Sequence, residues 1–83
     1  MDKEKYRNMY LAEAAEHLQS MSEILLRLDS EPENHHEIDA LFREAHSIKG
    51  MAATMEYAET ARLAHRLEDN LDLCRKRGSV SSA

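Results

Sequence analysis

Residues 38–55 read IDALFREAHSIKGMAATM, and this stretch decides the fold. Its apolar residues alternate between spacings of three and four, as one face of an α-helix requires. They are Ile38, Leu41, Ala45, Ile48, Ala52 and Met55, with Phe42 beside them. The same spacing recurs before this stretch, at Leu11, Ala14, Leu18, Met21, Leu25 and Leu28, and after it, at Ala64, Leu67, Leu71 and Cys74. We therefore expect helices over about residues 3–29, 33–55 and 58–77.

The connections between these helices are short. In the first, Ser30 is expected to cap the second helix and Pro32 to start it. The second lies near Glu56, where neither glycine nor proline marks the break. Gly78 ends the third helix, and residues 79–83 are expected to be a flexible tail. Short connections make neighbouring helices antiparallel, so we expect an all-α, antiparallel up-down bundle with one domain over residues 1–78.

Composition and charge exclude several classes of protein. A chain of 83 residues holds one modest core, and two glycines and one proline argue against a β fold. The net charge of −5 disfavours nucleic acid and anionic membrane surfaces as partners. A single cysteine, Cys74, fits a reducing compartment, and no apolar run is long enough for membrane insertion. We expect a cytoplasmic protein.

His46 is the first candidate for chemistry. It projects to the side of its helix's apolar stripe, with Lys49 one turn later on the same side and Gly50 four residues on, beneath the imidazole. Glycine inside a helix costs about 1 kcal/mol relative to alanine, so we expect a compensating use, such as access for a partner. The alternative is that His46 is one of five solvated histidines and Gly50 is accidental.

His65 and Glu68 are neighbours on the third helix because they are three residues apart. Glu68 lies on the flank of the apolar stripe, where an antiparallel second helix would pack. A carboxylate there could accept a hydrogen bond from Nδ1 of His46 and leave Nε2 as a nucleophile. On the residues alone, an exposed histidine and an ordinary surface charge are the simpler interpretation.

Other motifs are scarce. The chain has no H-x-x-x-H, C-x-x-C or glycine-rich phosphate loop, so no ATP site is predicted. A histidine-based metal site that uses His46, His65 and Glu68 stays open as an alternative. The methionines are expected to fill the core; they are Met9, Met21, Met51 and Met55.

The stretch from Phe42 to Met55 resembles the phosphoacceptor helix of histidine phosphotransfer (HPt) domains, above all the N-terminal domain of CheA-type chemotaxis histidine kinases. The resemblance extends to AEAAEHL at 12–18, LLRL at 25–28 and LAHRLEDNLD at 63–72. It covers about residues 1–78, and the H-x-x-K-G motif followed by H-x-x-E makes it specific.

The resemblance implies a function and a role for each motif residue. His46 would accept the γ-phosphoryl group of ATP on Nε2, and Glu68 would hydrogen-bond its Nδ1. Lys49 would offset the phosphoryl charge, His65 would join this polar cluster, and Gly50 would leave room for partners. The partners would be the histidine kinase catalytic domain and CheY-like and CheB-like response regulators. ATP and magnesium would bind to the kinase domain, so no cofactor is expected here.

Two departures from the family accompany the resemblance. HPt domains usually have glycine at the position of Glu56, where a left-handed backbone would cost glutamate about 1 kcal/mol. The family fold is a four-helix bundle, and the fourth helix is expected to be missing from this sequence. We therefore expect a homodimer that buries the open groove, or three helices that close on themselves. A helical interaction module without phosphotransfer is the remaining alternative function.

Overall fold

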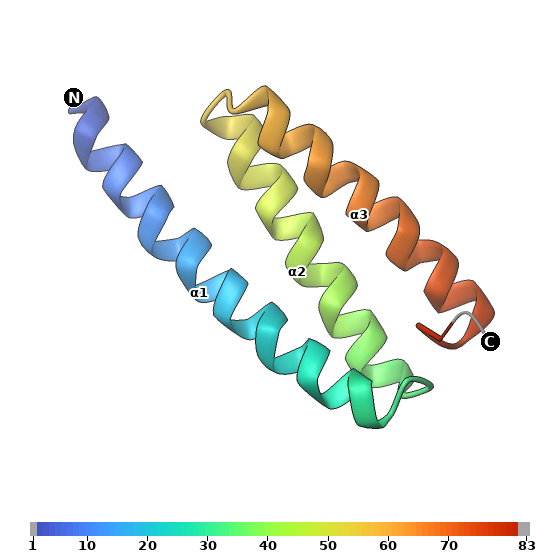
Figure 1. The fold of residues 1–83 in the computed structure, drawn as a ribbon. Coiled ribbons are helices and arrows are strands. Elements are labelled where there is room, and N and C mark those ends of the chain that lie inside the picture. The colour runs from blue at the N-terminus through green and yellow to red at the C-terminus, as the bar shows by residue number, and fades with distance from the viewer. Residues whose placement is uncertain (1, 82–83) are drawn as a thin grey trace.

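The computed structural model describes residues 2–81, which form three α-helices and no strand. The helices are α1 (Lys3–Ser30), α2 (His35–Thr54) and α3 (Ala58–Arg77). Figure 1 shows them side by side, with α2 between α1 and α3. Helix α2 packs against both neighbours, whereas α1 and α3 do not pack against each other. The all-α expectation is confirmed, and the three helices do not close on themselves.

Helix α2 begins at His35, two residues later than the sequence suggested. Its N-cap is Asn34 rather than Ser30: the Asn34 side chain accepts a hydrogen bond from the backbone N–H of Glu37, with 3.2 Å between nitrogen and oxygen. The Ser30 hydroxyl instead donates to the carbonyl of Arg27, inside α1. Asparagine is as good an N-cap as serine, and Pro32 then belongs to the turn rather than to the helix.

The buried face of α1 differs from the expected stripe. Met21 and Leu28 are buried as predicted, and Ile24 joins them. The other leucines of the predicted stripe are about half exposed: Leu11 (53%), Leu18 (56%) and Leu25 (53%). Among the helices, α1 packs only against α2, so only a narrow strip of its surface is covered. The three exposed leucines lie about 100° around the helix axis from that strip.

The core lies along α2, with the C-terminal half of α1 on one side and the C-terminal half of α3 on the other. Its buried residues are Met21, Ile24, Leu28, Ile38, Leu41, Ala45 and Leu71. Towards the other end of the bundle, α2 and α3 approach through the small buried residues Ala52 and Ala64. Arg75 adds two contacts from α3 to α2: its guanidinium lies 3.9 Å from the centre of the Phe42 ring and 3.7 Å from Asp39. These contacts fix the register of α2 and α3.

The turn between α2 and α3 closes through a left-handed residue. Glu56 has φ 61°, a conformation that residues with a Cβ atom rarely adopt. Its N–H donates to the carbonyl of Ala53, and the N–H of Tyr57 donates to that of Ala52. This is the Schellman pattern of helix ends, which satisfies carbonyls that the helix leaves unpaired.

Helix α3 ends at Gly78 as expected, with φ 84°. Val80, which follows this end, contacts the rest of the domain: its N–H donates to the carbonyl of Pro32 at 2.9 Å, and Val80 packs against the core. The flexibility expected for residues 79–83 stays a prediction. Residues 82–83 lie outside the described residues.

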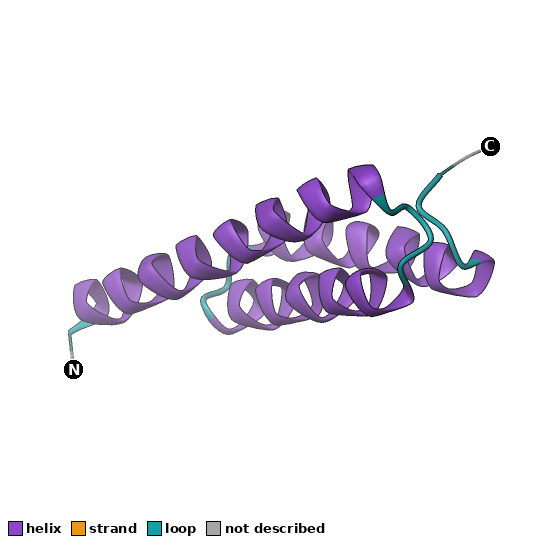
Figure 2. Ribbon diagram, turned by 90° about the horizontal axis from the view of Figure 1, so that it is seen from below, coloured by secondary structure: helices purple, strands orange, loops and turns teal. Residues whose placement is uncertain are grey.

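The bundle is elongated and one of its sides is open. Its radius of gyration is 14.0 Å, compared with about 12 Å for a compact domain of this length. Figure 2 shows the three helices running nearly along one another, joined by short loops. Within residues 2–81, none of the helices is both long and apolar enough to cross a membrane.

Candidate functional site

A hydrogen bond between His46 and Glu68 joins α2 to α3. Nδ1 of His46 contacts Oε2 of Glu68. The side chain of Glu68 is only 10% exposed, while that of His46 is 64% exposed. The structure therefore contains the contact between His46 and Glu68 that the sequence suggested. Its carboxylate is buried and its imidazole is exposed.

Lys49 binds the second oxygen of the same carboxylate. Its Nζ lies 2.7 Å from Oε1 of Glu68. The hydrogen bond from Lys49, supported by the one from His46, holds the pKa of the Glu68 carboxyl below its ordinary value, against the opposing effect of burial. Glu68 is thus an ionised acceptor at neutral pH. Lys49 was predicted to lie near phosphoryl oxygens; here its ammonium group is bound to Glu68.

The ionised state of Glu68 determines the tautomer of His46. A carboxylate can only accept hydrogen bonds, so Nδ1 of His46 must donate. The neutral imidazole then carries its lone pair on Nε2, on the opposite side of the ring. Because the His46 side chain is largely exposed, this nucleophilic nitrogen can be approached by a second molecule.

Gly50 lies on the open side of α2. A Cβ atom built at this position would have no neighbour within 4 Å, so glycine is not required by packing inside the domain. Gly50 and His46 line the same cleft between α1 and α2. The absence of a side chain at position 50 leaves space next to His46 in this cleft.

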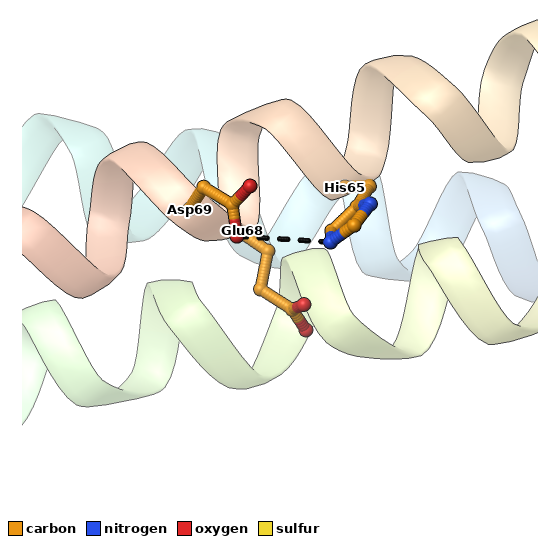
Figure 3. Close-up of side chains that lie close together, drawn as sticks. All are labelled: His65, Glu68 and Asp69. Carbon is orange, nitrogen blue, oxygen red and sulfur yellow. Dashed lines mark ion pairs between the residues drawn. The ribbon is translucent and has the colours of Figure 1, made fainter.

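His65 lies beside Glu68, but its ring takes no part in the hydrogen bonds of His46, Lys49 and Glu68. Its Nε2 is 3.7 Å from Oδ1 of Asp69, one turn further along α3. In Figure 3, Glu68 extends from α3 towards α2, whereas His65 and Asp69 lie close to each other along α3. The role of His65 in the polar cluster therefore stays a prediction.

A cleft of about 600 Å³, which helical spacing did not predict, lies between α1 and α2. Three of the four methionines that were assigned to the core line it instead; they are Met9, Met51 and Met55. Only Met21 is buried. Tyr10 also lines the cleft, and its ring packs edge-on against Tyr57 with 5.1 Å between the ring centres. The cleft gives the His46 side of the domain an adaptable apolar surface.

A second pair across the helices was also missed. Nδ1 of His17 lies 2.7 Å from Oε2 of Glu44, and both side chains are less than one third exposed. His17 lines the same cleft as His46. Helical spacing could not reveal this pair, because it depends on how α1 is rotated against α2.

Comparison with known proteins identifies the family. The family model of the Hpt domain matches residues 5–83. The chemotaxis protein CheA of Bacillus subtilis is 43% identical over 75 residues, which is 90% of this chain and 11% of the relative. The chemotaxis protein CheA of Halobacterium salinarum is 38% identical over 71 residues, 86% of this chain and 11% of the relative. The chain thus spans about a tenth of the length of these curated relatives.

A solved structure supports the same family. The CheA phosphotransferase domain from Thermotoga maritima superimposes with a TM-score of 0.90 at 35% identity. The match covers 99% of this chain and 78% of the solved chain.

Proposed function

Because this chain belongs to the Hpt domain family, we propose that it is the phosphotransfer domain of a chemotaxis-type histidine kinase and that His46 is its phosphoacceptor. The observation that carries this proposal is the hydrogen bond of His46 to buried Glu68, which leaves Nε2 nucleophilic on an exposed ring. His17 pairs with the partly buried Glu44 and His65 lies beside the exposed Asp69, and neither histidine has a glycine four residues later, as His46 has.

The first step is phosphoryl uptake. Nε2 of His46 attacks the γ-phosphorus of ATP held by a separate kinase domain; the new N–P bond forms as the bond to the ADP oxygen breaks. Glu68 holds the Nδ1 proton throughout and stabilises the positive charge that develops on the ring. Lys49 fixes Glu68 through its second oxygen and places a positive charge beside the site. Such a reaction, which consumes ATP, belongs in the cytoplasm.

The second step is phosphoryl release. The carboxylate of an aspartate in a CheY-like or CheB-like regulator attacks the phosphorus, and the N–P bond breaks with its electron pair returning to Nε2. The cleft beside His46 and the space over Gly50 provide the surface on which the kinase domain and the regulator approach in turn.

The test is phosphorylation of this chain by the catalytic domain of a chemotaxis histidine kinase with ATP and magnesium. We expect phosphate that is labile in acid and stable in base, and none in His46→Gln, with helicity unchanged by circular dichroism. His36→Gln, which removes another exposed histidine of α2, serves as the matched control. Phosphate retained in His46→Gln would move the acceptor to another histidine and refute the assignment.

A further inference from the structure

A cluster of potential metal ligands on α3 includes Glu68, the hydrogen-bond partner of His46. His65, Glu68 and Asp69 each offer one ligand atom, and these atoms all lie within 4.8 Å of one another. Spacings of three and four residues place all three on one side of the helix. His65 and Asp69 are exposed, and Glu68 is buried (Figure 3).

We propose that His65, Glu68 and Asp69 bind a divalent transition-metal ion of the zinc type, and that the bound ion draws Glu68 away from His46. The metal site does not depend on the proposed function, whereas its regulatory effect rests on it. One imidazole nitrogen and two carboxylate oxygens are ligands that zinc accepts, and three protein ligands leave a position for water.

The distances require only a modest rearrangement. Tetrahedral ligands with bonds of about 2.0–2.1 Å lie about 3.3–3.4 Å apart. Nε2 of His65 and Oδ1 of Asp69 are already 3.7 Å apart, and they form no hydrogen bond with each other that would have to be broken. The carboxylate of Glu68 must turn from α2 towards this exposed pair, which costs it part of its contact with His46 and Lys49.

The ligand types determine which ions fit. Magnesium and calcium require about six or more oxygen ligands, whereas a site with an imidazole suits zinc and its neighbours in the first transition row. The positive charge of the ion also repels the Lys49 ammonium group, which holds Oε1 of Glu68. Zinc therefore competes with both partners of Glu68.

Binding is tested on the 83-residue chain by calorimetric titration with zinc, with cobalt as a spectroscopic substitute and magnesium as the negative control. We expect one zinc ion per chain. His65→Asn and Asp69→Asn should each weaken binding at least about tenfold, the loss that even an outer-shell partner causes. Both side chains are more than half exposed, so neither substitution disturbs the core.

Two controls make the assignment specific. His36→Asn removes an exposed histidine outside the cluster and should leave zinc binding unchanged. His46→Gln should also retain the ion. The site is refuted if wild-type protein binds no zinc, if Asp69→Asn binds as tightly as wild type, or if His46→Gln abolishes binding, because the ion would then lie on the phosphoacceptor.

The regulatory effect is measured as the initial rate of His46 phosphorylation with and without saturating zinc. We expect zinc to slow the wild-type chain and to leave Asp69→Asn unaffected. Equal slowing of both proteins would place the effect on the kinase domain and overturn the regulatory half of the proposal. A chain that takes up no phosphate even without zinc would refute the proposed function, while the calorimetric result would still decide the metal site.

Discussion

A side chain at position 50 is expected to affect the stability of α2 and the phosphorylation of His46 in opposite directions. Nothing inside the domain needs the missing side chain, so Gly50→Ala should fold normally and stabilise the helix by about 1 kcal/mol, or about 4–8 °C in Tm. If the space serves partner access, the same substitution should slow phosphorylation of His46, and the longer side chain of Gly50→Gln should slow it further. Thermal melts and initial rates on the same preparations measure both effects.

The control for Gly50 is Arg43→Ala, on an exposed position of the same helix, which should change neither quantity by much. Unchanged phosphorylation rates in both Gly50 variants would mean that partners do not approach over this position.

Glu68 links stability to pH. Its pKa in the folded domain is lowered, first by the hydrogen bond from Lys49, so folding favours its ionised form. The resulting stabilisation is fully present above the unfolded pKa of about 4.3 and is lost as the pH falls through the lower folded value. We expect the Tm difference between wild type and Glu68→Gln to shrink as the pH falls below about 4.3.

Asp72 has a lowered pKa as well, because Arg75 and Lys76 bind it, so the wild-type profile alone is not diagnostic. The comparison with Glu68→Gln isolates the buried carboxylate. Parallel profiles of the two proteins down to low pH would contradict the contribution assigned to Glu68.

Among single residues, His46, Lys49 and Gly50 could be recognised from the sequence. They are three and four residues apart on one helix, so their spacing alone makes them neighbours on its surface. The sequence also indicated Glu68 as a candidate, but it did not reveal the hydrogen bond between Lys49 and Glu68. The His17–Glu44 pair was out of reach, since residues on different helices meet only once the rotation of α1 against α2 is known.

At the scale of elements, the turn after α2 carries backbone strain. Glu56 adopts a left-handed conformation, which costs a residue with a Cβ atom roughly 1–2 kcal/mol. Glycine adopts this conformation without that cost, but it loses more conformational entropy on folding. Glu56→Gly should therefore raise the free energy of unfolding by about 0.5–1 kcal/mol. Urea denaturation measures the change, and an increase is expected without effect on phosphorylation, because the Glu56 side chain is exposed and lies outside the hydrogen bonds of His46, Lys49 and Glu68.

The matched control is Glu59→Gly, an exposed glutamate in the first turn of α3 with helical geometry, where glycine should be destabilising. A destabilised Glu56→Gly would show that the turn does not hold residue 56 in the left-handed region.

The sequence predicted that there are three helices and roughly where they lie. It predicted less well where each helix ends and which side of it is buried. The three apolar repeats placed α1, α2 and α3 correctly. The start of α2 was misplaced because Ser30 and Asn34 are both good caps, and only the structure shows which one binds a free N–H group. The face of α1 was misplaced because leucines outnumber the positions that α2 can cover.

At the scale of the molecule, α1 and α3 flank an uncovered groove. Leu11, Leu18 and Leu25 form an exposed row on α1, and Leu67 on α3 is 38% exposed between buried Ala64 and Leu71. These four leucines are already about half covered, so burying the rest of each contributes about half of the 1.5–3 kcal/mol of a fully exposed leucine, or about 3–6 kcal/mol for the four together. We predict that the 83-residue chain forms a two-fold dimer through this groove at micromolar concentration.

Sedimentation equilibrium tests the dimer, with Leu18→Glu expected to yield a monomer near 9.5 kDa. Leu73→Glu changes an exposed leucine outside the groove-lining set and should remain dimeric. A wild-type monomer that melts cooperatively would refute the dimer.

The anchoring of α1 has a consequence for how the domain opens. Its buried residues all lie in the C-terminal half, from Met21 onwards, while the contacts of the N-terminal half include the Tyr10–Tyr57 ring contact and the His17–Glu44 pair. Such a segment unfolds locally at a lower free energy than the core. We expect amide hydrogens of residues 6–17 to exchange with solvent well before those around Leu41, as mass spectrometry can measure. The first turns of α1 would then move away from the cleft by local unfolding. The hydrogen bond between His46 on α2 and Glu68 on α3 would stay formed.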